Sequence, residues 1–390
     1  MAFAVDFADK TSPNSQRKES FRNAKAMDLL MKNTTEKILN VAIIGCGGIA
    51  NSKHMPGLLT VKQAKMVAFC DIVEEKAEKA KEKFGTPDSK VYTDYKELLK
   101  DESIDVVHIC TPNRSHSFIT IDSLRAGKHV MVEKPMAKTA AEAREMVKVA
   151  KETGMKLTVG YQNRCRPESV YLKKEVMEKG LLGEVYYAKA LAIRRRATPT
   201  WGVFLNEYEQ GGGPLIDIGT HALDLTLYMM DNYEPKMVLG TSYKKLNNPE
   251  CGNVWGPWDP EQHKVEDSAF GFIIMKNGAT INLESSWALN IVDPIEASTV
   301  LCGTKAGAQI KNKELILNYD KDDKLVEEKP VNDYEGTIKQ ASAGAEAQQW
   351  IDAILNDTDP CVLPEQACVV SEILEAIYES AKTGAPVYFD

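Results

Sequence analysis

Residues 38–50 read Ile-Leu-Asn-Val-Ala-Ile-Ile-Gly-Cys-Gly-Gly-Ile-Ala, a short aliphatic run that ends in a glycine loop of the pattern G-x-G-x-x-A. Gly45 permits a tight turn, and Gly47 lets the backbone approach a ligand closely. Ala50 is small enough for a helix to pack against the strand. We therefore predict a strand, a glycine turn and a helix that together open a βαβ unit.

Downstream of this loop, strand-like runs alternate with helical stretches as far as about residue 160. The predicted strands are 38–44, 66–70, a run that ends at Cys110, 129–132 and 156–160. The predicted helices include 74–84, 117–126 and 140–153. The alternation predicts a parallel sheet, and the continuously apolar runs indicate strands that are covered on both faces. We therefore predict an α/β Rossmann domain over residues 38–160.

The pattern changes after about residue 161. Strand-like segments lie at 185–194, 237–243, 268–275, 279–286 and 299–302, and two helices follow near 344–355 and 365–383. Asn277-Gly278 predicts a hairpin turn, because both residues accept a positive φ. We expect residues 161–390 to form an α+β domain with a mostly antiparallel sheet. Residues 1–37 are polar and predict an N-terminal arm.

The composition narrows the class of protein. The chain has 390 residues, of which 43% are hydrophobic and 27% charged, so it is long enough for two domains with sizeable cores. A net charge of -8 argues against a nucleic-acid partner, and the lack of an apolar run of about 18 residues argues against a membrane span. The eight cysteines lack zinc-ligand spacing. We expect a cytoplasmic protein without a metal site.

The glycine loop and an acidic residue together predict a site for NAD(H). The loop residues are Gly45, Gly47, Gly48, Ile49 and Ala50. Asp71 ends the second strand, somewhat beyond the usual spacing of about 20 residues. A carboxylate there binds both ribose hydroxyls and repels a 2′-phosphate, and no arginine follows it. We therefore predict NAD rather than NADP. The alternatives are a glycine turn without a ligand and a solvated carboxylate.

Two further stretches follow predicted strands. They are Cys110-Thr111-Pro112-Asn113 with His116, and Glu133-Lys134-Pro135. Ligands of open parallel sheets bind beyond the carboxyl ends of the strands, so both stretches should border the ligand crevice. The proline after Lys134 keeps the backbone extended and would aim the ammonium group into the crevice. The alternative for Lys134 is an ordinary solvated surface lysine.

A third stretch, 211–221, contains Asp217 and His221 four positions apart. On a helix, residues at this spacing share a face. Histidine is the usual general base near neutral pH, and a nearby carboxylate can orient it and stabilise its cation. The pair therefore predicts removal of a proton from an alcohol whose carbon loses a hydride. The alternative is a helix-capping aspartate beside a structural histidine.

Taken together, these motifs resemble the glucose–fructose oxidoreductase, inositol dehydrogenase and rhizopine catabolism (Gfo/Idh/MocA) family of oxidoreductases, from about residue 38 to the C-terminus. Residues 161–164 and 265–267 also carry the resemblance. It implies a Rossmann domain followed by a domain with a large open antiparallel sheet. It also implies that another subunit covers the exposed face of this sheet, which would give a homodimer or homotetramer. The implied substrates are sugars, inositols and related cyclic alcohols.

The resemblance also implies roles for individual residues. The family's catalytic lysine falls on Lys134, and its aspartate and histidine fall on Asp217 and His221. We expect His221 to accept the hydroxyl proton, Lys134 to hydrogen-bond the same oxygen, and Asp217 to orient His221 and contact the substrate. Expected cofactor contacts beyond the glycine loop and Asp71 are Thr111, Pro112, Asn113, His116, Glu133 and Lys134. Expected substrate contacts are Lys134, Asn163, Arg164, Arg196, Trp201, Asp217 and His221.

We therefore predict an NAD-dependent dehydrogenase that oxidises a secondary hydroxyl of a sugar, glycoside or cyclitol, with C3 of a glycoside among the candidates. Trp201 and the arginines at 194–196 suit a sugar or sugar acid, but they also suit subunit contacts or core packing. One alternative is a glycoside-cleaving enzyme that uses tightly bound NAD for transient oxidation. Another is a non-catalytic dinucleotide sensor, against which the intact Lys134, Asp217 and His221 argue.

Overall fold

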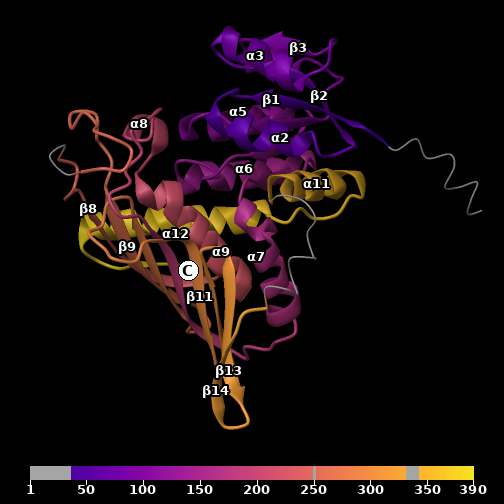
Figure 1. Cartoon of the computed structure of the whole chain (residues 1–390). Coiled ribbons are helices and arrows are strands. Elements are labelled where there is room, and N and C mark those ends of the chain that lie inside the picture. Colours follow the sequence, from indigo (N-terminus) through magenta and orange to yellow (C-terminus); the bar gives the residue numbers. More distant parts are fainter. Residues whose placement is uncertain (1–36, 249–251, 331–341) are drawn as a thin grey trace, which may run out of the picture. The chain divides into compact units, whose positions relative to one another are not determined.

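The computed structural model describes residues 37–248, 252–330 and 342–390. The predicted N-terminal arm lies outside the described residues except for Lys37. The compact unit 39–390 contains two β-sheets (Figure 1). The first has six strands in the order β3-β2-β1-β4-β5-β6, and the second has nine in the order β14-β13-β12-β11-β7-β10-β9-β8-β15. The prediction of a Rossmann domain and an α+β domain with a large, mostly antiparallel sheet is confirmed.

The first sheet is parallel and doubly wound. Its strands are β1 (Leu39–Ile44), β2 (Ala64–Cys70), β3 (Lys90–Tyr92), β4 (Val106–Ile109), β5 (His129–Val132) and β6 (Leu157–Val159). The strand order reverses between β1 and β4, and a ligand crevice forms at such a point. Ile44 pairs with Ile109, so the loops that follow these two strands lie side by side.

Helical segments connect these strands. They are η1 (Ala50–His54), α2 (Met55–Leu58), α3 (Glu74–Phe84), α4 (Tyr95–Leu99), η2 (Asn113–Ser115), α5 (His116–Arg125) and α6 (Ala140–Thr153). Helix α6 begins at a capping box formed by Thr139 and Glu142 and ends at Gly154, which has a φ of 69°. These local signals fix both ends of the helix, and the predicted helix 140–153 is confirmed. Strand β3 and helix α4 were not predicted, because their sequences are too short to show a period.

The second sheet is antiparallel except where β10 runs parallel to β7. Its strands are β7 (Val185–Ile193), β8 (Pro235–Tyr243), β9 (Ser268–Met275), β10 (Thr280–Ser286), β11 (Ile295–Gly303), β12 (Ala306–Lys311), β13 (Glu314–Lys321), β14 (Lys324–Glu328) and β15 (Val387–Tyr388). The predicted hairpin joins β9 to β10, but only Gly278 adopts a positive φ, of 90°. The Met275 amide donates to the Ala279 carbonyl at 2.8 Å, so residues 276–278 form a three-residue loop, within which the Gly278 amide donates to the Met275 carbonyl at 2.9 Å.

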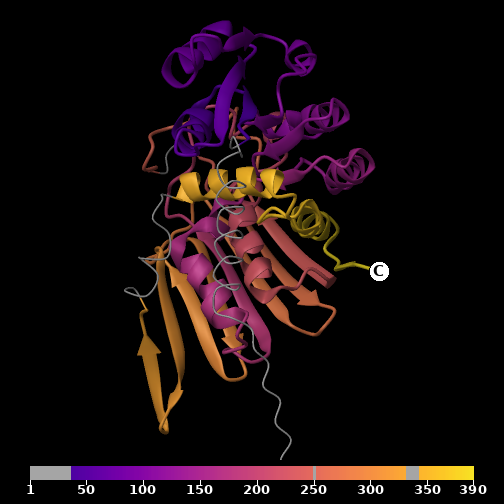
Figure 2. The same cartoon turned by 90° about the vertical axis from the view of Figure 1, so that its right-hand side faces the viewer.

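Helices cover one face of this sheet (Figure 2). The helical segments of this half are η3 (Gln162–Cys165), α7 (Pro167–Tyr171), η4 (Leu172–Met177), α8 (Glu207–Gln210), η5 (Leu215–Gly219), α9 (Thr220–Met230), α11 (Ser342–Leu355) and α12 (Pro364–Thr383). Helix α9 packs on β7 and β11, and α12 packs on β8. On the other face, Leu239 and Phe272 face each other across two strands and are exposed. The expectation that a second subunit covers this face stays a prediction.

Helix α11 packs against the nucleotide domain rather than the second sheet. Its Trp350 and Ile351 are buried in the same apolar cluster as Val41 of β1 and Leu58 of α2. A C-terminal segment thus completes the core of the first domain, and the proposed division at residues 160 and 161 stays a prediction. No helix in the described ranges is both long and apolar enough to cross a membrane.

Candidate active site

The glycine loop has the shape that a dinucleotide requires. Gly45 has a φ of 91°, and a Cβ there would lie 2.7 Å from the Cys110 carbonyl group of the neighbouring strand end. Only glycine fits such a position. Gly47 and Gly48 instead face open space, which leaves room for a bound pyrophosphate beside the amides of the following helix.

Asp71 is fixed at the mouth of this loop. Its Oδ2 accepts a hydrogen bond from the Cys46 amide at 2.9 Å, and its Oδ1 accepts one from the Val73 amide at 2.9 Å. Each oxygen keeps a free lone pair for a ribose hydroxyl. These residues therefore fit NAD, which would supply the hydride-accepting nicotinamide ring when bound.

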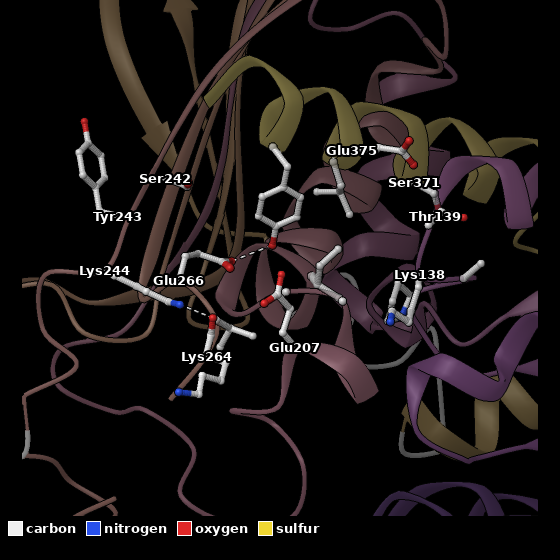
Figure 3. Close-up of a pocket in the computed structure, with 18 residues that line it drawn as sticks. Lys138, Thr139, Glu207, Ser242, Tyr243, Lys244, Lys264, Glu266, Ser371 and Glu375 are labelled. Atoms are coloured by element: carbon white, nitrogen blue, oxygen red, sulfur yellow. Dashed lines mark hydrogen bonds between the residues drawn. The ribbon is translucent and has the colours of Figure 1, made fainter. Parts of the chain in front are cut away.

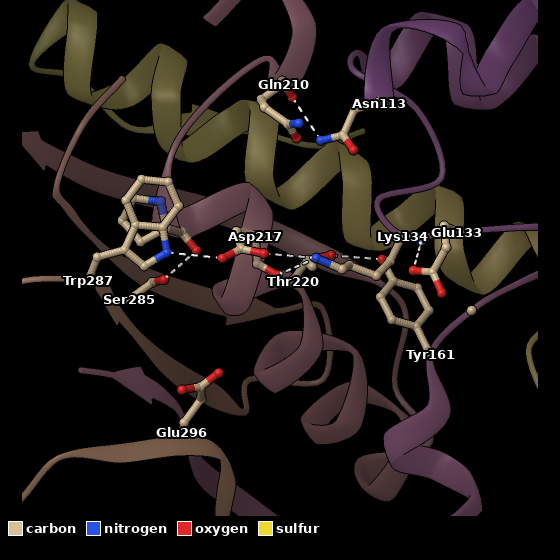
Figure 4. Close-up of polar contacts among 12 residues, drawn as sticks. Asn113, Glu133, Lys134, Tyr161, Gln210, Asp217, Thr220, Ser285, Trp287 and Glu296 are labelled. Atoms are coloured by element: carbon tan, nitrogen blue, oxygen red, sulfur yellow. Dashed lines mark hydrogen bonds and ion pairs between the residues drawn. The ribbon is translucent and has the colours of Figure 1, made fainter. Parts of the chain in front are cut away.

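Lys134 and Asp217 form the centre of the site (Figure 4). Lys134 follows β5, and its Nζ donates to both the backbone oxygen and Oδ1 of Asp217, each at 2.9 Å. Trp287 follows β10, and its indole Nε1 donates to Oδ2 of Asp217 at 3.0 Å. Burial acts to raise the pKa of Asp217, but the Lys134 and Arg194 cations outweigh it and lower that pKa. Asp217 is therefore ionised.

His221 stands beside this pair with an unused nitrogen. Its Nδ1 is buried and has no hydrogen-bond partner among the described residues, and its ring packs edge-on against Tyr161 at 6.0 Å. Burial and the cations of Lys134 and Lys53 lower the pKa of His221 to about 3. The imidazole is therefore neutral at physiological pH and able to accept a proton.

The hydrogen bonds of Asp217 go to residues other than His221. In the described part of the chain, no hydrogen bond joins the two, but burial lowers the pKa of His221 and the charge of Asp217 acts against that shift. Asp217 lies in the π-helix η5 and His221 in α9, and the expected roles of Asp217 toward His221 and the substrate stay predictions. Asp217 orients Lys134, and the tryptophan that holds Asp217 in place, Trp287, was not predicted.

Glu133, the residue before Lys134, belongs to a buried cluster. Its Oε1 accepts from Lys53 Nζ at 2.7 Å and lies 2.8 Å from His54 Nε2. Lys53 also pairs with Glu346 of α11 at 3.1 Å. Burial acts to raise the pKa of Glu133, but Lys53 and His54 hold it well below its usual value. Glu133 Oε2 accepts from the Lys134 amide at 3.1 Å, so the cluster supports the lysine, and direct contact of Glu133 with the cofactor stays a prediction.

His116 supports the loops around the cofactor crevice. Its ring nitrogens lie 2.8 Å from the Pro135 carbonyl and 2.9 Å from the Thr111 carbonyl, and the residue is fully buried. Neither nitrogen is left for a cofactor, which corrects the expected contact. Asn113 donates from Nδ2 to the Gln210 carbonyl at 3.0 Å. Contacts of Thr111, Pro112 and Asn113 with NAD stay predictions.

Arg164 does not face a substrate, which corrects another expected contact. It is buried, and its guanidinium pairs with Asp224 at 3.0 and 2.6 Å while also donating to Gln366 at 2.7 Å. Its role is to join η3 to α9. Asn163 is also buried, but its Oδ1 has no partner among the described residues, so its contact with substrate stays a prediction.

Arg194, rather than Arg196, approaches the centre of the site. Its NH1 lies 3.9 Å from Asp217 Oδ2, whereas Arg196 donates from Nε to Asn290 at 2.8 Å. Arg194 and Trp287 both follow strands of the second sheet, which is mostly antiparallel, so the rule for parallel sheets that located Lys134 could not have located them. Substrate contact by Arg196 stays a prediction.

A cavity of about 590 Å³ is lined in part by Gly212 and by Ile216 of η5 (Figure 3). Glu266 lines it, and its carboxylate accepts hydrogen bonds from the Gly213 amide at 2.8 Å, the Leu215 amide at 3.2 Å and the Tyr378 hydroxyl at 2.8 Å. Lys134, Asp217 and His221 do not line this cavity. Glu266 therefore anchors the start of the segment that carries Asp217.

Comparison with known proteins agrees with this geometry. The chain matches the oxidoreductase family with an NAD-binding Rossmann fold over residues 39–161 and the C-terminal alpha/beta domain of that family over residues 174–389. It is 35% identical to D-glucoside 3-dehydrogenase of Escherichia coli (strain K12), over 90% of this chain and 98% of that protein. It is 26% identical to scyllo-inositol 2-dehydrogenase (NAD(+)) of Bacillus subtilis (strain 168), over 91% and 97%.

Solved structures share the fold. An aldose-aldose oxidoreductase from Caulobacter crescentus superposes with a TM-score of 0.75 at 25% identity, over 90% of this chain and 100% of that chain. Levoglucosan dehydrogenase in complex with NADH superposes with a TM-score of 0.79 at 22% identity, over 91% and 100%.

The fold and the site thus define a two-domain oxidoreductase that binds NAD through a Rossmann domain. The family matches cover most of the chain. The chain belongs to the Gfo/Idh/MocA family of oxidoreductases, and the predictions of the family and of NAD as its cofactor are confirmed.

Proposed function

We propose that this protein is an NAD-dependent dehydrogenase that oxidises the C3 hydroxyl of a glucoside. The observation that carries the proposal is the convergence of an ionised Lys134–Asp217 pair and a neutral His221 beside the NAD crevice. Support for the substrate comes from the match over nearly the full length of D-glucoside 3-dehydrogenase.

Lys134 is prepared to stabilise a developing alkoxide. An ammonium group has three donor hydrogens, and two of them are occupied by Asp217. The third is available for the substrate hydroxyl oxygen. Because Asp217 fixes the position of the ammonium group, little reorganisation is needed as charge develops on that oxygen.

His221 is the proposed base. Its neutral ring removes the proton from the substrate hydroxyl while a hydride leaves the carbon that bears this hydroxyl. Burial, together with the neighbouring Lys134 cation, lowers the pKa of the histidine and keeps it unprotonated before the reaction. The same cation offsets the negative charge on the substrate oxygen during the reaction. The two residues therefore act on the same oxygen in complementary ways.

Spectrophotometry of NADH with a substrate panel tests the proposal. The panel contains glucosides, free sugars, sugar acids and inositols, each with NAD, and the products are identified by mass spectrometry and NMR. We expect NADH and a 3-keto glucoside in equal amounts. Cleaved glycoside without net NADH would instead establish the transient-oxidation alternative, and NADH from inositols alone would contradict the glucoside assignment.

We also propose that residues 38–160 bind NAD and that residues 161–390 bind substrate and form subunit contacts. The protein is a cytoplasmic homodimer or homotetramer. Light scattering during size-exclusion chromatography would measure the number of subunits directly.

A further inference from the structure

We propose that Trp201 and Trp255 form a subsite for an uncharged, aromatic or apolar aglycone, beside the residues that act on the sugar ring. The proposal rests on the proposed function and adds to it the chemical class of the glucoside. Trp201, Phe204, Trp255 and Trp287 are called the aromatic wall below.

The aromatic wall begins at the reactive centre. Trp287 donates its indole N–H to Oδ2 of Asp217 at 3.0 Å. The Phe204 ring lies edge-on to Trp287 with 6.5 Å between ring centres, and Trp201 lies edge-on to Phe204 at 6.0 Å. The aromatic contacts thus lead without a break from Asp217 to Trp201.

The wall returns to the same aspartate along its other side. Trp255 lies edge-on to Trp201 with 4.9 Å between ring centres. The Arg194 guanidinium lies 5.2 Å from the centre of the Trp255 ring, and its NH1 lies 3.9 Å from Asp217 Oδ2. The contacts therefore form a closed ring through Asp217, which makes the wall part of the site that holds the substrate.

The two outer tryptophans present apolar surface to solvent. Trp201 is 52% exposed and Trp255 is 40% exposed, whereas Trp287 is fully buried. Burying an exposed indole face against an apolar group is favourable, and contact between aromatic rings adds about 0.5–1.5 kcal/mol. The inner tryptophan orients Asp217, and the outer two are available for a ligand.

The loops that carry the outer tryptophans are held together. The Thr198 amide donates to Asn253 Oδ1 at 2.8 Å, and Asn253 Nδ2 donates back to the Thr198 carbonyl at 3.0 Å. Thr200 Oγ1 donates to the Trp255 carbonyl at 2.9 Å. The surface is therefore already formed before a ligand binds, which lowers the entropic cost of binding.

The charges along the wall do not favour an anionic aglycone. Arg194 lies over the Trp255 ring, and Glu296 already neutralises it through two hydrogen bonds of 2.7 and 2.6 Å. Asp217 and Glu296 would both repel a carboxylate or phosphate. In a glucoside the aglycone leaves the ring two carbons away from C3. A substituent on C1 can therefore extend along the wall while Lys134 and His221 hold C3.

A comparison of two glucosides tests the subsite. The substrates are phenyl and methyl glucosides, each as both anomers. With NAD as cofactor, kcat/KM is measured for the unchanged protein, Trp201→Ala, Trp201→Phe and Trp255→Ala. We expect each alanine variant to lower the phenyl-to-methyl ratio of kcat/KM about fivefold to tenfold, because only the phenyl glucoside has an aglycone ring that can contact the outer tryptophans. The Trp201→Phe variant should keep most of the preference. Tyr388→Ala removes an exposed aromatic ring at the far edge of the sheet and serves as the control.

Several results would overturn the subsite. Equal phenyl-to-methyl ratios in the unchanged protein and both alanine variants would do so while leaving the proposed function intact. A change of oligomeric state in Trp201→Ala with an unchanged ratio would show that the wall is a subunit contact. If the unchanged protein makes NADH from neither glucoside, the proposed function fails and the subsite fails with it.

Discussion

Glu133 and Lys134 are adjacent in the sequence, yet they belong to two groups of charges that are built differently. Glu133 lies in the buried cluster, where Lys53 contacts two carboxylates and His54 contacts one. Lys134 lies in the crevice with Asp217 and His221, and all three are partly exposed. In the buried cluster the charges of Lys53 and Glu133 are matched by ion pairs, whereas the crevice keeps a lysine hydrogen and a histidine nitrogen unused. The comparison predicts that the first group serves stability and the second serves chemistry.

The strongest test of this comparison removes the ammonium group from the crevice. We expect Lys134→Met to lower kcat/KM for the glucoside about a thousandfold, because the developing alkoxide loses its charged donor. The free energy of unfolding should fall by about 1–3 kcal/mol, because the mostly buried Asp217 loses one partner but keeps its hydrogen bond from Trp287. Steady-state NADH kinetics and urea unfolding measure the two effects. Lys138→Met is the matched control, and an active Lys134→Met variant would remove this residue from the mechanism.

A lysine-to-methionine substitution in the buried cluster should instead reduce stability more than activity. Lys53→Met leaves Glu133 and Glu346 without their shared cation, and breaking such a buried pair costs about 3–5 kcal/mol of stability. Urea unfolding measures the loss, and activity per folded molecule should fall far less than in Lys134→Met. A stable but inactive Lys53→Met protein would mean that both groups serve catalysis and that the comparison is wrong.

A smaller effect is expected at Asp71, which lies in neither group. We expect Asp71→Ser to raise the KM for NAD about tenfold, because a ribose hydroxyl loses a charged acceptor. The repulsion of a 2′-phosphate should also weaken, so the preference for NAD over NADP falls. Kinetics with both cofactors measure these values. If Asp71→Ser changes neither the KM for NAD nor the preference for NAD over NADP, Asp71 does not bind the ribose.

The smallest effect concerns pH. His221 has an ordinary pKa of 6.5 when unfolded and a pKa of about 3 when folded, so between these values the unfolded chain binds more protons. Protonation of His221 in the unfolded chain therefore lowers the free energy of unfolding as the pH falls below 6.5. Between pH 7 and pH 5, we expect the free energy of unfolding of His221→Asn to fall by about 1 kcal/mol less than that of the unchanged protein. Urea unfolding at both pH values measures this difference, and equal losses would show that the folded histidine is not held neutral.

The sequence could predict the elements whose signals are local. Residues 140–153 form the predicted helix because the capping box at Thr139 and the glycine at 154 mark both ends. Gly45 needs a positive φ next to another strand, and the glycine pattern carries that requirement. Lys134 could be found because a strand end precedes it. These signals lie within a few residues of the feature they predict.

The rest depends on contacts between distant segments. Arg164 and Asp224 are 60 positions apart, and only the fold shows that the arginine is buried against the aspartate rather than open to substrate. The spacing of Asp217 and His221 predicts a shared helical face, whereas residues 215–219 form a π-helix in which Asp217 accepts a hydrogen bond from Lys134. Trp287 reaches Asp217 from another strand across 70 positions. Such partners have no signature in the local sequence.

The destination of the C3 hydrogen shows which carbon of the glucoside is oxidised. Methyl glucoside carrying deuterium at C3 is incubated with the protein and NAD, and the reduced dinucleotide is isolated for mass spectrometry. We predict that the reduced dinucleotide carries the deuterium and that the sugar product is the 3-keto glucoside. Reduced dinucleotide without deuterium would contradict oxidation at C3, and it would direct the proposed roles of Lys134 and His221 to another carbon of the ring.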